Sequence, residues 1–371
     1  MITVSTKHAN DISRTAGAGV PTPGKIIVAF VLLLATLVFH GCDTAPLQPD
    51  ISLVDFWRQA IPSEQHVPVV GIVFNADNEM FVAEYGKGIA QYEQTAPGLW
   101  EKLDFTTFDD SHFTELHHDS LTGYLYAGTY HGHVYRSTNN GTTWVDISPP
   151  DTSNTDLINH ISGIVTSPLQ ELFIARSAEG IYYSSDYGET WYLTFGAPSI
   201  NGITTLAYSL SNELYAGTMR EGMYRGSSFQ GSPYWTVTLD FFNQITIAKS
   251  DSGGAALFGT DNGELYSWGP DGFQYLWNDP GVKEAVVDIA IAPTGGMFLS
   301  LYKHGVYHMP AGGTTFGQAN AALYDRWVRC LAIDRDGFVY AGTETEGIFK
   351  TVFPAQFYDD TSDTTDTGDD Q

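Results

Sequence analysis

The chain repeats one short apolar stretch seven times, and its clearest copies are LYAGT at 125–129, LYAGT at 214–218 and VYAGT at 339–343. The remaining copies keep the apolar run and place a small residue near its end: MFVAE at 80–84, LFIAR at 172–176, ALFGT at 256–260 and MFLSL at 297–301. Successive copies start between 41 and 47 residues apart. A near-constant period of this length indicates a repeat architecture in which each unit packs against the next.

Each copy has apolar segments on both sides. An apolar strand precedes it, as in GIVFN at 71–75, and a glycine turn with another strand follows it, as in GHVYR at 132–136. A more variable fourth segment carries tryptophan, at Trp100, Trp144, Trp191 and Trp235. Four short strands in about 42 residues form one propeller blade. The sequence therefore predicts an all-β fold, a seven-bladed β-propeller of four-stranded antiparallel blades, over residues 51–358.

The seventh unit ends at GIFKTVFP, residues 347–354, without a clear fourth strand. The segment ISLVDFWRQA at 51–60 precedes the first unit and carries a tryptophan, as the other fourth strands do. We predict that this N-terminal strand completes the last blade, because closing the ring leaves no unpaired sheet edges. The alternative is that 51–60 forms a short helix and that the chain after Lys350 closes the ring.

The N-terminal region has the pattern of an export signal. Residues 26–39 are 14 mostly apolar residues preceded by Lys25. This length is short for a membrane span and suits the apolar core of a signal peptide. Because Gly41 and Cys42 follow directly, residues 1–41 resemble a bacterial lipoprotein signal peptide, with Cys42 as the lipidated residue. Phe39 and His40 depart from the usual pattern, so an uncleaved anchor and ordinary cleavage remain alternatives.

The segments that flank the predicted propeller are polar. Residues 42–50 contain two prolines and few apolar side chains, and we expect a tether. Residues 359–371 read DDTSDTTDTGDDQ, without an apolar residue, and we expect a disordered acidic tail. Together with the export signal, these segments predict a membrane-anchored lipoprotein of the bacterial cell envelope, on its periplasmic or cell-surface side.

The charge of the chain restricts its partners. Its 43 acidic and 17 basic residues give a formal net charge of −26. A nucleic-acid-binding protein carries a basic face, and this sequence has no cluster of lysine and arginine. We therefore exclude nucleic acid, and we expect neutral or cationic partners such as a protein or a glycan, with contact to the membrane only through the lipid anchor. We expect a monomer.

Two predicted hairpin turns carry a recognisable motif. SSDYGETW at 184–191 fits the pattern S-x-D-x-G-x-T-W, and STNNGTTW at 137–144 fits it with Asn139 in place of aspartate. The chain thus resembles the Asp-box (BNR-like) propellers, a group that includes sialidases, xyloglucan hydrolases and photosystem assembly factors. The resemblance covers about residues 65–353. It implies structural roles for the motif residues, which are Ser137, Asn139, Gly141, Trp144, Ser184, Asp186, Gly188, Thr190 and Trp191.

The expected ligand site of such a propeller is its axial mouth, lined by the loops that join the second and third strands of each blade. In this sequence those loops contain aromatic residues and charges of both signs. Aromatic faces pack against sugar rings or peptide side chains, and polar groups fix orientation. The ligand-binding candidates are Tyr85, Tyr130, His131, Arg176, Arg220, Tyr302 and His304. The alternative is that these are ordinary solvated turn residues.

The sequence shows no catalytic constellation. The sialidase resemblance calls for three arginines and a Phe/Tyr-Arg-Ile-Pro motif, and the nearest stretch, RQAIP at 58–62, does not match it. His117, His118 and Asp119 could form a metal cluster, but successive side chains of a strand point to opposite faces, so we predict no metal and no cofactor. We expect a binding or scaffold module that recognises a protein or a glycan. The alternative is a glycoside hydrolase, sialidase-like or xyloglucanase-like, acting on extracellular glycans.

Overall fold

The computed structural model describes residues 55–96, 98–150, 159–194, 202–209, 211–227, 234–239, 243–251, 253–269 and 272–359. The chain divides into two units, residues 1–50 and residues 51–371, and the described residues all belong to the second. The predicted signal peptide, Cys42 and the tether lie outside the described residues. Within the described part of the chain, no helix has the length and apolarity needed to cross a membrane.

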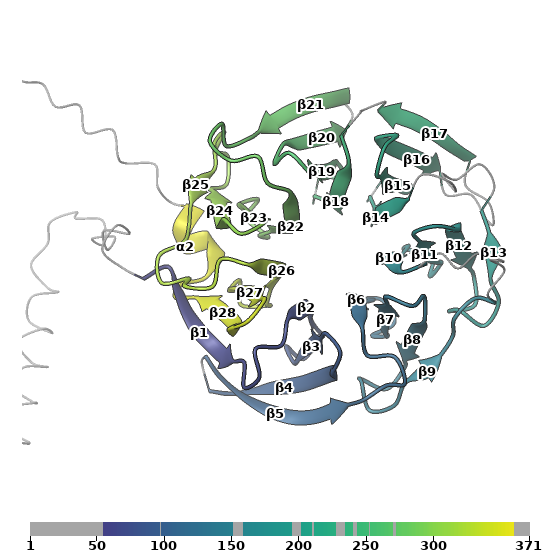
Figure 1. Cartoon of the computed structure of the whole chain (residues 1–371), viewed down its shortest axis with the longest axis horizontal. Coiled ribbons are helices and arrows are strands. Elements are labelled where there is room, and N and C mark those ends of the chain that lie inside the picture. The colour runs from purple at the N-terminus through teal and green to yellow at the C-terminus, as the bar shows by residue number, and fades with distance from the viewer. Residues whose placement is uncertain are drawn as a thin grey trace, which may run out of the picture. The chain divides into compact units, whose positions relative to one another are not determined.

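The second unit is a ring of seven four-stranded antiparallel sheets (Figure 1), which confirms the predicted seven-bladed β-propeller. Blades 1 to 6 follow the chain, beginning with β2 to β5, and blade 7 contains β26, β27, β28 and β1. The inner strands are β2 (Val69–Phe74), β6 (Phe113–His118), β10 (Ile161–Thr166), β14 (Ile203–Tyr208), β18 (Ile245–Ser250), β22 (Val286–Ile291) and β26 (Val328–Ile333). The second strands are β3 (Met80–Glu84), β7 (Leu125–Thr129), β11 (Leu172–Arg176), β15 (Glu213–Thr218), β19 (Ala256–Thr260), β23 (Met297–Leu301) and β27 (Val339–Thr343).

The third and fourth strands complete each blade toward the outside of the ring. The third strands are β4 (Gly88–Ala96), β8 (Val134–Ser137), β12 (Gly180–Ser184), β16 (Met223–Ser227), β20 (Leu265–Gly269), β24 (Gly305–Met309) and β28 (Gly347–Thr351). The outer strands are β5 (Leu99–Thr106), β9 (Val145–Asp146), β13 (Tyr192–Leu193), β17 (Tyr234–Leu239), β21 (Gly272–Trp277), β25 (Gly317–Gln318) and β1 (Trp57–Pro62). A short helix, α2 (Ala355–Asp359), follows blade 7.

The outer strand of blade 7 comes from the start of the propeller. β1 pairs antiparallel with β28, with Trp57 opposite Thr351 and Pro62 opposite Gly347. The Trp57 side chain is fully buried, and its Nε1 donates a hydrogen bond of 2.6 Å to the carbonyl oxygen of Ala319. The described strand thus begins within the segment 51–60 and runs two residues beyond it.

The predicted acidic tail begins at a residue that takes part in the fold. Asp359 is the last residue of α2, and its Oδ1 accepts a hydrogen bond of 2.9 Å from the backbone of Ala311. Its carboxylate also accepts a hydrogen bond from Thr294 and lies 3.6 Å from His308 Nε2. The remaining tail residues lie outside the described part.

The small residue in the repeated stretch is explained by contact between blades. A Cβ added at Gly128 would lie 2.4 Å from a side-chain atom of Ile161, the first residue of the next inner strand. The equivalent Gly259 meets Val286 in the same way, again at 2.4 Å. Such distances are far inside van der Waals contact, so these positions exclude a larger side chain. Glycine in these blades lets the second strand pack directly against the β-branched residue of the next inner strand.

Side-chain hydrogen bonds hold the turn between β12 and β13, which contains Asp186. Asp186 Oδ1 accepts hydrogen bonds of 2.8 Å from Ser184 Oγ and from the Thr190 backbone, and its Oδ2 accepts one from Thr190 Oγ1. Trp191 Nε1 donates 2.6 Å to the carbonyl oxygen of Ile147, which belongs to the preceding blade. These turns join third and fourth strands. They therefore lie on the face opposite the turns between second and third strands.

Candidate functional site

A β-bulge at the same place in every blade builds the lining of the axial cavity. The register between the inner and second strands shifts at the second residue of each inner strand. Those residues are Val70, Thr114, Ser162, Thr204, Thr246, Val287 and Arg329. A bulge releases one residue from the ladder and re-aims its side chain. All but Thr246 line one axial cavity of about 380 Å³, together with Tyr85, Phe113, Glu115, Tyr130, His160 and Ile161.

The hydroxyl groups of this ring differ in their hydrogen bonds. Thr114 Oγ1 donates 2.6 Å to the Ile161 carbonyl oxygen, and Thr246 Oγ1 makes the same bond to Val286. These bonds join adjacent blades. Ser162 is 5% exposed, and its Oγ has no hydrogen-bond partner among the described residues. Buried polar atoms are normally paired, so this hydroxyl is an exception within the ring, and it is enclosed by the protein itself.

Aromatic side chains stand at the mouth of the cavity on blades 1 to 3. Tyr85 follows β3 and Tyr130 follows β7, whereas His160 precedes β10. The rings of Tyr130 and His160 stack, with centroids 6.0 Å apart. Tyr85 meets the ring of His112 edge-on at 5.2 Å. The mouth therefore offers flat apolar faces beside polar groups, as ligand sites commonly do.

Beside these aromatics, one carboxylate contacts two imidazoles. His112 Nδ1 lies 3.0 Å from Asp110 Oδ1, and His131 Nδ1 lies 3.1 Å from Asp110 Oδ2. Burial alone would raise the pKa of Asp110, but hydrogen bonds from Thr129, from the His112 backbone and from both rings outweigh it and lower the pKa to about 2. The carboxylate is therefore ionised at neutral pH.

A second group of charged residues lies along the axis. Lys249 Nζ lies 3.4 Å from Asp288 Oδ1, and both Asp288 oxygens also accept backbone hydrogen bonds, from Ile289 and Leu331. Burial raises the pKa of Glu115 to about 7, although the positive charge of Lys249 acts in the opposite direction. The Glu115 carboxyl group in the cavity wall is thus about half protonated at pH 7.

The structure distributes the predicted binding residues unevenly. Tyr85 and Tyr130 line the axial cavity, and His131 lies edge-on to Tyr130 at 5.5 Å. Arg220 is exposed after β15, and Tyr302 packs beside Trp327 at 6.1 Å. Tyr85 and Tyr130 are the candidates that line the cavity, with His131 beside Tyr130, whereas Tyr302, His304 and Arg220 are not among the residues that line it.

Arg176 has a role within the protein. It is 5% exposed, and its guanidinium donates to the carbonyl oxygens of Pro149 and Gly132 and to Glu179. These contacts join the end of β11 to the loop before β10. We therefore leave Arg176 out of the proposed site.

His117 and Asp119, from the sequence motif His117-His118-Asp119, make separate contacts. His117 Nε2 lies 3.0 Å from Thr166 Oγ1, and burial lowers the pKa of His117 to about 4. Asp119 instead accepts hydrogen bonds from Leu121 and Thr122 in the following turn. These contacts give the two residues separate structural roles.

Several residues of the mouth were not identified from the sequence, namely Asp110, His112, His160, Ser162 and Glu115. Their signal was weak, because the loops before the inner strands differ in length and sequence from blade to blade. The sequence offers one clue. The second residue of each inner strand, such as Ser162 in ISG at 161–163, interrupts the alternation of inward and outward side chains. Only the bulge shows that this residue points to the axis.

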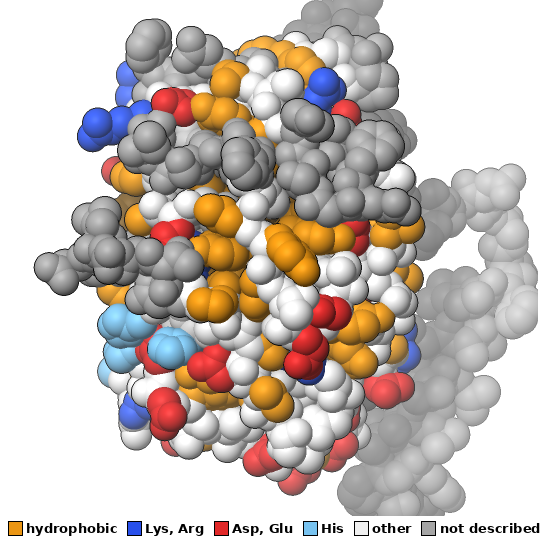
Figure 2. Space-filling model, turned by 90° about the vertical axis from the view of Figure 1, so that its right-hand side faces the viewer, with side chains coloured by type: hydrophobic (Ala, Val, Ile, Leu, Met, Phe, Trp, Pro, Cys, Tyr) orange, Lys and Arg blue, Asp and Glu red, His pale blue; other side chains and the backbone are white. Residues whose placement is uncertain are grey.

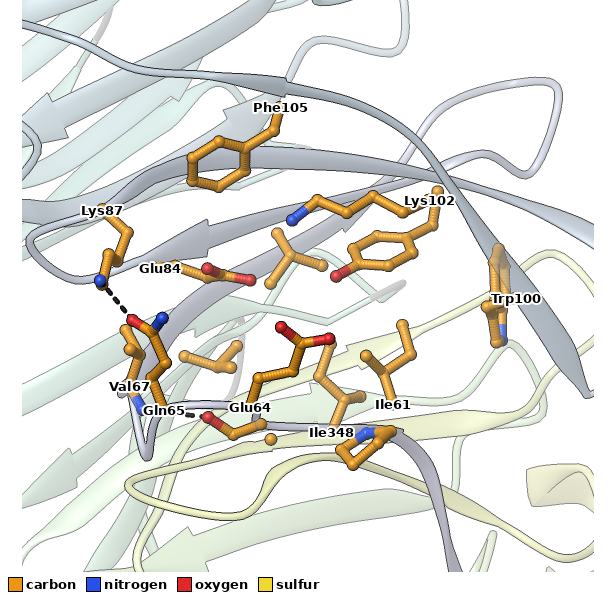
Figure 3. A pocket seen from close by; sticks show the side chains of 16 residues that line it. Ile61, Glu64, Gln65, Val67, Glu84, Lys87, Trp100, Lys102, Phe105 and Ile348 are labelled. Carbon is orange, nitrogen blue, oxygen red and sulfur yellow. Dashed lines mark hydrogen bonds between the residues drawn. The ribbon is translucent and has the colours of Figure 1, made fainter.

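A second recess, of about 500 Å³, lies between blade 7 and blade 1. Figure 3 shows its apolar wall, which includes Ile61, Val67 and Ile348, and the ammonium end of Lys102 beside the ring of Phe105. Lys102 Nζ lies 4.2 Å from that ring centroid. Burial raises the pKa of the neighbouring Glu84, while Lys102 acts to lower it. Glu64, Glu84, Lys87 and Lys102 all line this recess, so it carries charges of both signs beside its apolar wall. None of the binding residues predicted from the sequence lines it, and we do not place the proposed site there.

Figure 2 views the ring from the side of blades 2 to 4. Histidine side chains gather at one edge of this view, beside acidic side chains. The outer wall of the same blades exposes apolar residues, including Val145, Tyr192 and Leu193, each more than half exposed. The histidine and acidic side chains thus form one region of this surface, and the exposed apolar side chains form another.

Comparisons with known proteins identify the fold alone. No family model and no curated protein matches the chain. Among solved structures, the extracellular domain of the one-component system BT4673 from B. thetaiotaomicron has a TM-score of 0.60 at 14% identity, over 81% of this chain and 40% of that one. The chain therefore spans less than half the length of that domain. Virginiamycin B lyase from Staphylococcus aureus has a TM-score of 0.65 at 12% identity, and the match covers 80% of this chain and 99% of the lyase. YCF48 bound to D1 peptide has a TM-score of 0.60 at 16% identity, and the match covers 84% of this chain and 99% of YCF48.

Proposed function

We propose that this protein is an exported binding module of the cell envelope, anchored through Cys42, whose axial mouth takes a segment of a partner protein. The observation that carries the proposal is the cavity of about 380 Å³, with Tyr85, Tyr130 and His160 at its mouth. A cavity of this size holds a few side chains rather than a folded domain. The Asp-box resemblance supports the same type of protein.

The chemistry of the cavity favours a peptide segment. Tyr85 and Tyr130 present aromatic faces, which pack against apolar or cationic side chains. Thr114, Ser162 and Thr204 add small polar residues to the cavity wall, beside which the polar groups of a peptide can lie. The solved structure of YCF48 with D1 peptide gives a propeller precedent for this kind of ligand.

The glycoside hydrolase alternative has less support. Such an enzyme needs two carboxyl groups free to act on one glycosidic bond. Among the described residues, Asp288 is already engaged by Lys249 and by two backbone amides, and Glu344 is paired at 2.7 Å with Arg329 of the cavity wall. The raised pKa of Glu115 gives that carboxyl group the character of a general acid. We therefore propose binding rather than hydrolysis.

A peptide display selection tests the proposal. Peptides selected on the wild-type protein should lose at least tenfold in affinity, about 1.4 kcal/mol, on the double variant Tyr85→Ala/Tyr130→Ala. Tyr192→Ala is the matched control, because Tyr192 is also exposed but lies on β13 at the outer wall. Selected peptides that bind the double variant as they bind the control would refute the axial site. Glycans on an array that bind wild type but not the double variant would replace the peptide with a carbohydrate.

A further inference from the structure

Outside the cavity itself, three side chains bring together the donor atoms of a metal site. Asp110 and His112 lie in the loop before β6, and His131 lies in the turn after β7. One donor atom from each lies within 4.8 Å of the other two. The Asp110 carboxylate links the imidazoles at 3.0 and 3.1 Å. Two imidazole nitrogens and one carboxylate oxygen are ligands that first-row transition metals share.

The spacing is close to that of a coordinated ion. Ligand atoms of tetrahedral Zn²⁺ lie about 2.0–2.2 Å from the metal and so about 3.4 Å from one another. The two contacts to Asp110 are slightly shorter than this, and the largest separation in the group is within 4.8 Å. Small rotations of the two rings therefore bring all three donors around one ion. Both rings are accessible, with 47% and 57% of their side-chain surfaces exposed.

Blade 7 shows that the fold needs the carboxylate but not the imidazoles. Asp325 occupies the position of Asp110, three residues before its inner strand. Its Oδ1 accepts the Trp327 backbone amide at 3.0 Å, as Asp110 Oδ1 accepts that of His112. Its Oδ2 accepts the backbone and hydroxyl of Thr345, the counterpart of His131. The aspartate thus organises the loop in both blades, and blade 2 adds histidine where blade 7 has Trp327 and Thr345.

We propose that Asp110, His112 and His131 bind a divalent transition-metal ion, with Zn²⁺ as the representative, at the rim of the axial cavity. Three protein ligands leave a further position for water or for a donor of a bound partner. The mixed nitrogen and oxygen donors disfavour Mg²⁺ and Ca²⁺, which prefer oxygen ligands. The metal site can be tested apart from peptide binding, because neither Tyr85 nor Tyr130 supplies a ligand, although their rings contact those of His112 and His131.

Calorimetric titration of the full-length chain with Zn²⁺, in mild detergent because of its apolar segment 26–39, tests the proposal. We expect one tight site per chain in the wild type. His112→Ala and His131→Ala should each weaken it at least tenfold. Titration with Co²⁺ should give visible absorption bands that both substitutions abolish. Because both rings are exposed, the variants should keep the wild-type melting temperature in the absence of metal.

His133 provides the matched control. Its Nδ1 lies 3.0 Å from Asp146 Oδ2, and the two side chains are each 45% exposed, but only one imidazole contacts this carboxylate. His133→Ala should therefore bind Zn²⁺ as the wild type does. Equal affinity of the wild type, His112→Ala and His131→Ala would overturn the proposal, and so would an equal loss in His133→Ala. The double variant Tyr85→Ala/Tyr130→Ala should still bind Zn²⁺ tightly. That result would support the metal site even if the proposed peptide site proved wrong.

Discussion

At the scale of the residue, the repeated stretch specifies how closely two blades approach. Its glycine removes the Cβ atom that would collide with the next inner strand, and its final threonine is fully buried. The Oγ1 of Thr218 donates 2.9 Å to the Gly222 carbonyl oxygen, and that of Thr343 donates 2.8 Å to Gly347. The threonine thus fastens the turn that leads to the third strand. One stretch of five residues therefore encodes both the contact between blades and the turn beside the axial mouth.

Gly259→Ala tests the contact between blades. Its new Cβ would lie 2.4 Å from Val286 Cβ, so either the strands separate or the side chain shifts. We expect a loss of about 1–3 kcal/mol in the free energy of unfolding, as for other overpacked cores. Chemical denaturation measures it. In Gly317→Ala, the added Cβ has no neighbour within 4 Å, so this control should change stability by less than about 0.5 kcal/mol. Equal effects of the two substitutions would contradict the explanation of the repeat.

At the scale of the element, the blade pattern was predictable and the loops were not. Strands such as β7 and β27 carry apolar residues on both faces, because neighbouring blades cover both sides, and their period fixed the number of blades. The site is formed by the loops before the inner strands. There, Asp110 contacts His131 in the turn after β7 through its carboxylate, and the ring of His112 lies edge-on to that of His131 with centroids 5.4 Å apart. Contacts between segments of irregular length have no period, so the sequence placed Tyr85, Tyr130 and His131 in the repeating turns but did not identify Asp110 or His112 in the loop before β6.

Trp57→Ala tests the contribution of β1 to the last blade. The substitution removes a fully buried ring and its 2.6 Å hydrogen bond to Ala319. We expect a loss of about 3–5 kcal/mol in unfolding free energy, as for other buried tryptophans. Trp327→Ala is the matched control, since Trp327 is 43% exposed and should cost about 1 kcal/mol or less. If Trp57→Ala leaves too little folded protein to measure, Trp57→Phe, which removes only the indole hydrogen bond and part of the ring, should give an intermediate loss. A cost equal to the control would show that β1 is dispensable.

At the scale of the whole molecule, seven blades enclose a polar axis that none of them could bury alone. Glu115, Lys249 and Asp288 come from three different blades and interact electrostatically in the channel. Because 44% of the Lys249 side chain is exposed, its ion pair with Asp288 contributes little stability, whereas the raised pKa of Glu115 ties the stability of the ring to pH. The axial channel is thus a property of the assembled ring.

Glu115→Gln tests this dependence. The folded state raises the pKa of Glu115 from 4.5 to about 7, so the folded protein binds this proton more tightly than the unfolded chain does. The stabilisation is therefore present below about pH 4.5 and is lost as the pH rises to about 7. Glu115→Gln should be more stable than the wild type at pH 8, by up to about 3 kcal/mol, and nearly equal to it at pH 4. Denaturation curves at the two pH values measure the difference. A variant less stable than the wild type at pH 8 would show that the ionised carboxylate is favourably paired.

The pairing of β1 with β28 also dictates the order in which the ring can form. A chain delivered from its N-terminus presents Trp57 first, whereas Thr351 and the Ala319 carbonyl that it needs arrive almost at the end. Contacts between such distant residues form slowly, because a very long loop must close before they give any stabilisation. β1 therefore has no β28 to pair with until nearly the whole propeller has been synthesised. Closure is a late kinetic step, and the waiting strand is the segment on which a chaperone or a protease has the longest time to act.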